Sequence, residues 1–155
     1  MDSPTPFPSP TWFLRAMLAA AFLLSPAASA EAAKRFKGPV EATVIEIIDG
    51  DTFLTEAHVW PGHSVRVNIR VRGIDAPEVK SRCERERLAA LHAREVLTEL
   101  LGTGIVFISN IGGAKYYGRV LADVATTDGA AVSEIMLARD IVRPYRGGKR
   151  QSWCG

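Results

Sequence analysis

The sequence predicts an α+β domain that is mainly β, built as a small closed barrel of five strands with two to three helices. Three observations lead to this fold class: five short segments rich in β-branched residues, one long amphipathic segment between the third and fourth of them, and a length that limits the chain to one folded domain. With 155 residues, 47% of them hydrophobic and 23% charged, the chain has the composition of a soluble globular protein.

The first three strands are predicted from runs of Val, Ile and Thr, over Val40–Ile48, Thr52–Thr55 and Val65–Arg72. Asp49-Gly50 is a hairpin turn signal between the first two runs, and Trp60-Pro61-Gly62 provides the next turn. The third run alternates strictly between aliphatic and polar residues, so we expect one of its faces to enter the core. The aliphatic positions of that face are Val65, Val67, Ile69 and Val71.

A helix is predicted between the third and fourth strands. Ser81 followed by Glu84 matches a capping box, in which the hydroxyl and the carboxylate satisfy backbone amides at a helix start. The helix is expected to run to Leu101 and to end at Gly102. Apolar residues at helical spacing predict its buried stripe, which comprises Ala89, Ala93, Val96, Leu97 and Leu100.

The second half of the domain is predicted to contain two more strands, Ile105–Ser109 and Val120–Thr126, and a short helix over Ala131–Arg139. Five short strands with one helix between the third and the fourth favour the oligonucleotide/oligosaccharide-binding (OB) barrel. Periodicity alone leaves this topology as one of a few options.

Residues 1–30 have the layout of a cleavable secretory signal: Arg15 precedes an apolar run over Ala16–Leu24, and the small residues Ala28-Ser29-Ala30 follow. The run is far shorter than the roughly 20 residues that a membrane-spanning helix needs, so a permanent anchor is the weaker alternative. Translation from Met17 is a further alternative, since no Lys or Arg precedes Arg15. We expect a signal peptide over 1–30, a polar leader over 31–37 and the folded domain over 38–155.

The two cysteines of the chain, Cys83 and Cys154, both lie in the part that is expected to be exported. An oxidising compartment favours their pairing, and a closed loop of this length stabilises a fold by about 4 kcal/mol in the chain-entropy model. Zinc is the alternative, but neither cysteine has a second Cys or His at the usual ligand spacing. We therefore expect a disulfide that holds the C-terminal tail.

Three short stretches place acidic residues and arginines next to turns: Asp49-Gly50-Asp51-Thr52, Arg70 to Glu78, and Tyr116-Tyr117-Gly118-Arg119. Each stretch alone is compatible with an ordinary turn or strand end. Together they supply carboxylates that repel one another unless a cation lies between them. Oxygen ligands without a nearby His or Cys favour Ca²⁺ or Mg²⁺ over zinc. Pro77 keeps Ala76 extended, which makes the Ala76 carbonyl a candidate third protein ligand.

These stretches resemble the ordered signature of the staphylococcal nuclease (thermonuclease) family. The resemblance rests on Asp49-Gly50-Asp51-Thr52, on Arg70 five residues before Asp75-Ala76-Pro77-Glu78, and on Tyr117-Gly118-Arg119, with a helix between the second and third stretches. It covers roughly Val40 to Tyr145. The chain departs from the family at Tyr116, an extra aromatic that shifts the register of its loop by up to about one residue. It also ends soon after Tyr145, so we expect it to lack the long C-terminal helix of the family.

The resemblance implies a role for each matching residue. Asp51 and Asp75 match the family's calcium-binding carboxylates, and Ala76 matches the position that offers a main-chain carbonyl. Glu78 matches the general base toward the attacking water. Arg70 and Arg119 match the two arginines that hold the phosphate and stabilise the charge of its transition state.

The expected function is that of a calcium-dependent endonuclease, a phosphodiester hydrolase that cuts DNA or RNA with little sequence preference. Tyr116, Tyr117 and Tyr145 are candidates for stacking on bases, although a buried loop aromatic is the competing interpretation. The net charge of +2 permits a polyanionic partner without requiring one.

We expect a monomer that is exported to the periplasm or secreted, without stable membrane association once processed. The alternative is a catalytically weak nucleic-acid-binding module of the same fold.

Overall fold

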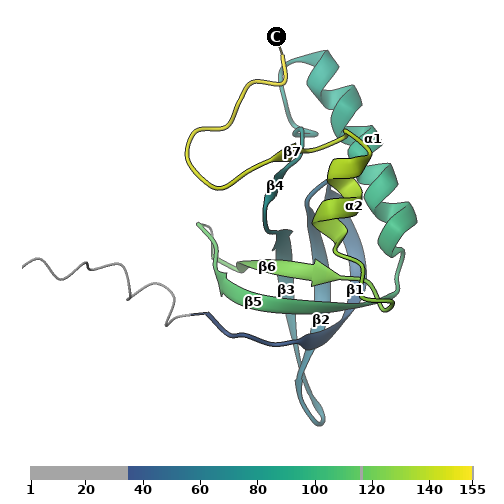
Figure 1. Cartoon of the computed structure of the whole chain (residues 1–155), viewed down its shortest axis with the longest axis vertical. Coiled ribbons are helices and arrows are strands. Elements are labelled where there is room, and N and C mark those ends of the chain that lie inside the picture. Colours follow the sequence, from purple (N-terminus) through teal and green to yellow (C-terminus); the bar gives the residue numbers. More distant parts are fainter. Residues whose placement is uncertain (1–34, 116, 155) are drawn as a thin grey trace, which may run out of the picture. The chain divides into compact units, whose positions relative to one another are not determined.

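Five long strands form a closed barrel in the order β1-β2-β3-β6-β5, which confirms the predicted fold class. β3 and β6 pair in parallel and the other neighbours are antiparallel. Figure 1 shows both helices on the same side of the barrel. The elements are β1 (Val40–Asp49), β2 (Thr52–Trp60), β3 (His63–Val71), β4 (Ile74–Asp75), α1 (Glu84–Leu101), β5 (Ile105–Gly113), β6 (Arg119–Ala125), α2 (Val132–Ala138) and β7 (Arg143–Pro144).

This architecture is that of a computed structural model, which describes residues 35–115 and 117–154. The predicted signal peptide, most of the polar leader and Tyr116 lie outside these described residues. No helix in the described ranges is both long enough and apolar enough to cross a membrane.

The barrel is filled by alternating strand residues and is closed by apolar residues of the two helices. Its largest fully buried side chains are Phe53, Ile69, Ile74, Leu97, Ile108 and Met136. Burial of an aliphatic or aromatic side chain of this size stabilises a fold by about 1.5–3 kcal/mol. Because α1 and α2 contribute to the same core as the strands, the helices hold the segments next to them in fixed positions.

The start of α1 differs from the predicted capping box. The N-cap residue is Cys83, and its side chain makes no capping hydrogen bond. Instead, the Ser81 hydroxyl donates to Glu86 Oε2 at 2.6 Å, and the Glu86 Oε1 atom accepts the Glu78 backbone N–H at 3.1 Å. The carboxylate that binds this loop therefore comes from Glu86, two residues later than predicted, and it ties the loop before α1 to the helix.

The buried stripe of α1 is also shifted by one residue at both of its ends. Ala90 and Leu101 are buried, whereas the predicted Ala89 and Leu100 are half-buried. Ala93, Val96 and Leu97 are buried as predicted. Ala89 and Ala90 are adjacent apolar residues about 100° apart around the helix, and so are Leu100 and Leu101. A stripe about 100° wide can therefore bury either residue of each pair, and sequence spacing does not decide between them.

The predicted apolar face of β3 enters the core only over its second half. Ile69 and Val71 are buried, whereas Val65 is about half exposed. The reason is that β2 runs on to Trp60, so that the β2–β3 hairpin extends beyond the barrel core. The outer end of this hairpin exposes Val59 and Trp60 as well.

Gly50 packs the β1–β2 turn against α1. A Cβ atom on Gly50 would lie 2.6 Å from the Ala93 Cβ and 3.0 Å from the Ala76 Cβ. The glycine is therefore required by close packing, and it brings the turn that carries Asp51 against the segment that carries Ala76.

Candidate functional site

Asp51 lies in the tight turn between β1 and β2, with its side chain buried. Its backbone carbonyl accepts the Val71 N–H at 2.8 Å, which fixes the turn to the end of β3. Its carboxylate accepts the Ala76 N–H at 2.9 Å and the Thr52 hydroxyl at 2.8 Å. These bonds hold a buried carboxylate at the junction of β1, β2 and β3.

Arg70, near the end of β3, connects two acidic residues. Its guanidinium donates to Asp51 Oδ1 at 2.7 Å and to Asp75 Oδ1 at 3.1 Å. The side chain of Arg70 is 19% exposed, and those of Asp51 and Asp75 are 4% and 5% exposed. A planar guanidinium suits such a paired contact, because it offers several N–H donors in a fixed geometry.

The segment after β4 presents the remaining acidic residue. β4 is a two-residue strand that pairs with β7 and places Asp75 beside Arg143. Pro77 is buried, whereas the Glu78 side chain is 59% exposed. Sequence patterns missed both β4 and β7, because two residues are too few to show periodicity.

Arg150 is a site residue that the sequence reasoning did not include. Its Nε donates to Asp75 Oδ1 at 2.7 Å, one terminal nitrogen donates to the Ala76 carbonyl at 2.7 Å, and the other contacts Glu78. Burial alone lowers the pKa of Arg150, but the hydrogen bond to Asp75 and the charges of Asp75, Glu78 and Asp51 raise that pKa above its ordinary value. The guanidinium is therefore a permanent cation in the cluster.

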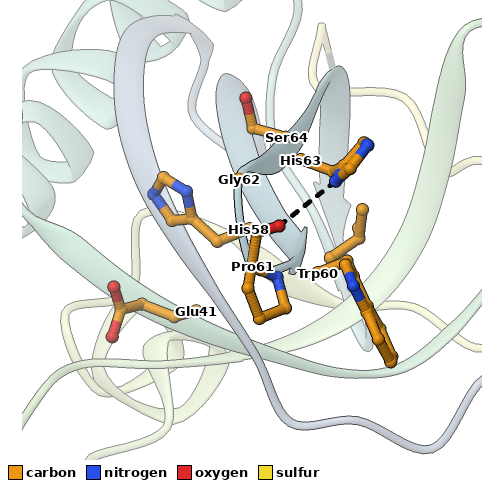
Figure 2. Close-up of a pocket in the computed structure, with 8 residues that line it drawn as sticks. Glu41, His58, Trp60, Pro61, Gly62, His63 and Ser64 are labelled. Carbon is orange, nitrogen blue, oxygen red and sulfur yellow. Dashed lines mark hydrogen bonds between the residues drawn. The ribbon is translucent and has the colours of Figure 1, made fainter.

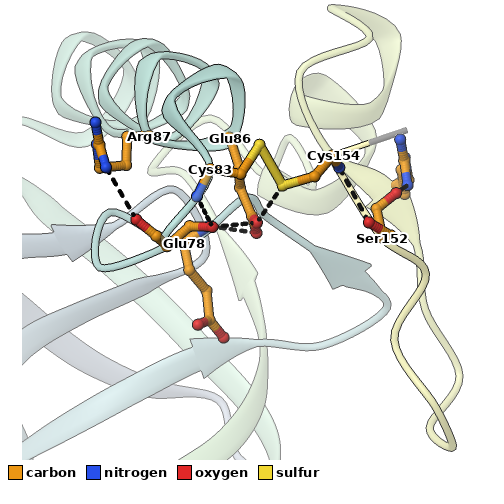
Figure 3. The surroundings of a disulfide bond; sticks show 8 residues. Glu78, Cys83, Glu86, Arg87, Ser152 and Cys154 are labelled. Carbon is orange, nitrogen blue, oxygen red and sulfur yellow. Dashed lines mark hydrogen bonds between the residues drawn. A yellow bond between two sulfur atoms is a disulfide. The ribbon is translucent and has the colours of Figure 1, made fainter.

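The disulfide between Cys83 and Cys154, predicted from the sequence, ties the tail to the start of α1. Figure 3 shows this bond beside Glu86, with Ser152 on the tail and Glu78 on the neighbouring loop. The chain after β7 loops outward and returns to the start of α1 (Figure 1). Trp153 stacks on the Arg143 guanidinium at 3.8 Å and directs its indole N–H to Asp75 Oδ2 at 3.5 Å.

Asp49 adds a further acidic group to this region. Burial raises the pKa of Asp49, and the charges of Asp51 and Glu78 raise it further. Arg94 and Arg70 act in the opposite direction and compensate only in part. The raised pKa of Asp49 therefore reflects its burial first and the neighbouring carboxylates second.

Arg119 and Tyr117 belong to the start of β6 and to the loop before it, and Tyr145 directly follows β7. Arg119 begins β6 and pairs with Asn68, two positions before Arg70, so both arginine side chains leave the same face of the sheet. Tyr117 is fully exposed, which excludes the buried interpretation for this residue. Tyr145 is half-buried and its hydroxyl donates to the Gly148 carbonyl at 2.7 Å. The candidate Tyr116 lies outside the described residues.

The oxygen donors of the cluster fit a hard cation in their chemistry. Carboxylates of Asp51, Asp75 and Glu78 and the Ala76 carbonyl all lie within hydrogen-bonding reach of Arg70 or Arg150. Oxygen donors of this kind are the ligands of Ca²⁺ and Mg²⁺. Within the described ranges, however, no three His, Cys, Asp or Glu side chains are already gathered for a metal. The donors instead bind two guanidinium groups.

A cleft of about 650 Å³ opens beside the cluster. Glu78 and Glu86 line it on one side, and the tail lines it with Lys149, Arg150, Gln151, Ser152 and Trp153. The cleft thus brings the exposed Glu78 carboxylate and basic tail residues to the same surface hollow. Its size and charge suit an extended, charged ligand better than a small apolar one.

A second hollow, of about 600 Å³, lies at the opposite end of β2 (Figure 2). His63 contacts the Pro61 carbonyl at 3.2 Å and His58 contacts the Thr43 hydroxyl at 3.1 Å. Glu41 is the only carboxylate in its lining. This hollow lacks the paired acidic and arginine groups of the cluster, so we place the candidate site at Asp51, Arg70, Asp75 and Glu78.

A comparison of the chain with protein-family models found no match, and a search of curated proteins found none either.

Proposed function

We propose that the protein is a calcium-dependent endonuclease that hydrolyses phosphodiester bonds of DNA or RNA with little sequence specificity. One observation carries the proposal: Arg70 joins two buried carboxylates, Asp51 and Asp75, next to the exposed carboxylate of Glu78. The resemblance of the same residues to the staphylococcal nuclease family supports it.

In this proposal, Arg70 binds the scissile phosphate. Two of its donors are held by Asp51 and Asp75, so the guanidinium is fixed in orientation before substrate arrives. Arg119 leaves the same face of the sheet and supplies a second guanidinium. Bidentate guanidinium contacts match phosphate oxygens and stabilise the negative charge that develops during the reaction.

Glu78 is the proposed general base. Its side chain is 59% exposed beside the cleft, so water can reach it. A positioned carboxylate that takes a proton from attacking water typically contributes about 10²- to 10⁴-fold to the rate. The Glu78 backbone N–H bond to Glu86 fixes the loop on which this carboxylate lies.

Asp51, Asp75 and the Ala76 carbonyl are the groups that would hold calcium. When bound, a hard cation polarises a phosphoryl oxygen and helps to position water. These donors are suited to that role because two of them are buried carboxylates, one in the β1–β2 turn and the other at the end of β4.

Single-stranded DNA or RNA is the substrate class that the surroundings favour. Basic residues of the tail and the exposed Tyr117 offer phosphate contacts and a stacking surface, neither of which depends on sequence. The family resemblance implies cleavage of the bond to the 5′ oxygen, which leaves 3′-phosphate ends. The predicted signal peptide and the disulfide support export to the periplasm or the medium. A monomer is the proposed state of the exported protein.

The test is digestion of end-labelled single-stranded DNA and RNA by the oxidised protein, with Ca²⁺ and then with a calcium chelator. We expect cleavage only with Ca²⁺, and a loss of about 10²-fold or more in Glu78→Gln. The matched control is Glu95→Gln, which neutralises an exposed carboxylate in the middle of α1.

The outcomes separate the proposed enzyme from the alternative. Equal cleavage by the wild-type protein and Glu78→Gln removes Glu78 from the mechanism. Binding of the labelled strand without cleavage under every condition rejects the nuclease and favours the binding module.

A further inference from the structure

Arg150 forms three contacts with the segment that carries the proposed calcium donors. A single guanidinium meets the Asp75 carboxylate, the Ala76 carbonyl and the Glu78 carboxylate. Its side chain is 33% exposed, so the contacts are made partly inside the protein. The residue comes from the C-terminal tail, 75 positions after Asp75.

We propose that Arg150 is a further functional residue of this site, an internal cation that occupies the Asp75, Ala76 and Glu78 oxygens and that calcium must displace. This inference rests on the proposed function, because Asp75 and the Ala76 carbonyl are assigned to calcium there and Glu78 is the proposed general base. The new element is a competition between Arg150 and calcium for the same oxygen atoms.

The charges of the cluster explain why a cation is needed in this position. Asp51, Asp75 and Glu78 provide three negative charges close to the carboxylate of Asp49, whereas Arg70 supplies one positive charge. Crowded carboxylates without enough positive charge repel one another. Arg150 and a divalent cation are two ways to remove the same repulsion, and both use the Asp75 and Ala76 oxygens.

The disulfide keeps Arg150 close to these oxygens. Cys154 lies four residues after Arg150, and its partner Cys83 lies five residues after Glu78. The short tether at the tail's end gives the guanidinium a high effective concentration at the site. Trp153, packed on Arg143 and directed at Asp75, holds the intervening residues against β4 and β7.

Reduction of the disulfide is therefore expected to release Arg150 and to strengthen calcium binding. A tail that is fixed only at β7 explores more space, so the guanidinium returns to the donors less often. The oxidised protein is therefore expected to bind calcium less tightly than the reduced protein. In the oxidised protein, Arg150 balances the charge of the carboxylates before calcium binds.

The test is calorimetric titration of the full chain with Ca²⁺, comparing the wild-type protein with Arg150→Gln. If Arg150 occupies the donors in nine of ten molecules, its removal raises the calcium affinity about tenfold. The matched control is Arg146→Gln, which removes the same charge from an exposed position four residues earlier in the tail. Circular dichroism establishes that both variants are folded.

A second arm uses Cys83→Ser/Cys154→Ser, which we also expect to bind Ca²⁺ more tightly than the oxidised wild-type protein. A position-specific readout is the Arg150 Nε–H resonance, which is expected to lose its protection from solvent exchange when Ca²⁺ is added. An Arg150→Gln affinity equal to or weaker than that of the wild-type protein overturns the inference. An equal gain in Arg146→Gln also overturns it, since the effect is then one of overall charge.

The inference and the proposed function fail in different ways. Tighter calcium binding by Arg150→Gln, with no cleavage by any variant, supports the competition and rejects the nuclease. Absence of calcium binding in every variant overturns the competition, while cleavage with another divalent cation would preserve the nuclease.

Discussion

Arg70 and Asp51 form a 2.7 Å ion pair between residues 19 positions apart, and the Asp51 carboxylate is almost completely buried. The same arginine reaches Asp75 at 3.1 Å. The end of β3, the β1–β2 turn and β4 are thereby joined by one side chain. Both the stability of this region and its proposed chemistry depend on Arg70.

We predict that Arg70→Leu destabilises the protein by about 3 kcal/mol, because it leaves two buried carboxylates without this partner. This is the lower end of the range for broken buried pairs, since Asp51 keeps the Ala76 N–H and the Thr52 hydroxyl, and Asp75 keeps Arg150. Urea unfolding followed by circular dichroism measures the change.

The control for this variant is Arg66→Leu, on the same strand and exposed. Its free energy of unfolding is expected to lie within about 0.5 kcal/mol of the wild-type value. A similarly small change in Arg70→Leu would show that the ion pairs contribute little to stability.

The disulfide is predicted to contribute about 4 kcal/mol, from the chain-entropy estimate for a loop closed over 71 residues. Denaturant unfolding with and without a reducing agent measures this contribution. The chain has only these two cysteines, so the reagent acts on no other thiol. Cys83→Ser/Cys154→Ser should match the reduced protein and be insensitive to the reagent. Identical unfolding midpoints in both conditions would contradict the prediction.

Asp49→Asn is predicted to stabilise the protein at neutral pH, with a rise in melting temperature. Burial, followed by the charges of Asp51 and Glu78, raises the pKa of Asp49 in the folded state. The folded state therefore binds this proton more tightly than the unfolded state does, so stability falls as pH rises from 3.8 through the raised pKa. Thermal melts should show the gain at neutral pH and no difference below pH 3.8.

Asp128→Asn provides a control of opposite sign. The Thr126 hydroxyl, followed by backbone hydrogen bonds, lowers the pKa of Asp128. A lowered pKa means stability that is present above the unfolded value and is lost as pH falls through the folded value. This variant should therefore be less stable than the wild-type protein at neutral pH and equal to it in acid. If both variants changed the melting temperature at neutral pH in the same direction, the assigned causes would be contradicted.

Tyr117→Ala is predicted to weaken binding of single-stranded DNA by about 1–3 kcal/mol without changing the melting temperature, since the side chain is fully exposed. Fluorescence anisotropy in the presence of a calcium chelator measures binding without cleavage. Trp60→Ala, an exposed aromatic at the outer end of the β2–β3 hairpin, is the control. Weaker binding in Trp60→Ala alone would place the nucleic acid at the hairpin.

The barrel could be predicted from sequence because its strands show β-branched runs, alternation and turn signals. Local patterns were less informative where an element leaves the core. The sequence predicts that β2 ends at Thr55, but the strand continues to Trp60, because the outer hairpin is held by β-pairing and contains exposed residues. The predicted capping box does not form, because the Ser81 hydroxyl binds Glu86 instead of pairing with Glu84.

Asp51, Arg70 and Asp75 could be predicted as candidate site residues because each stands next to a turn or strand end. Their mutual contacts follow from the barrel, which brings those ends together. Arg150 could not be found in this way, since it is distant in sequence and lies in no regular element. Its only sequence signal is its position four residues before Cys154, the partner of Cys83.

The most direct test of the central claim is the single-turnover rate of DNA cleavage by Arg70→Lys in saturating Ca²⁺, beside Arg66→Lys. Lysine retains the charge and loses the paired contacts, so we predict a rate lower by about 10²- to 10³-fold in Arg70→Lys. Arg66→Lys is predicted to cleave at the wild-type rate. Cleavage by Arg70→Lys at the wild-type rate would contradict the central claim. The phosphodiester chemistry would then not depend on the arginine that joins the two buried carboxylates.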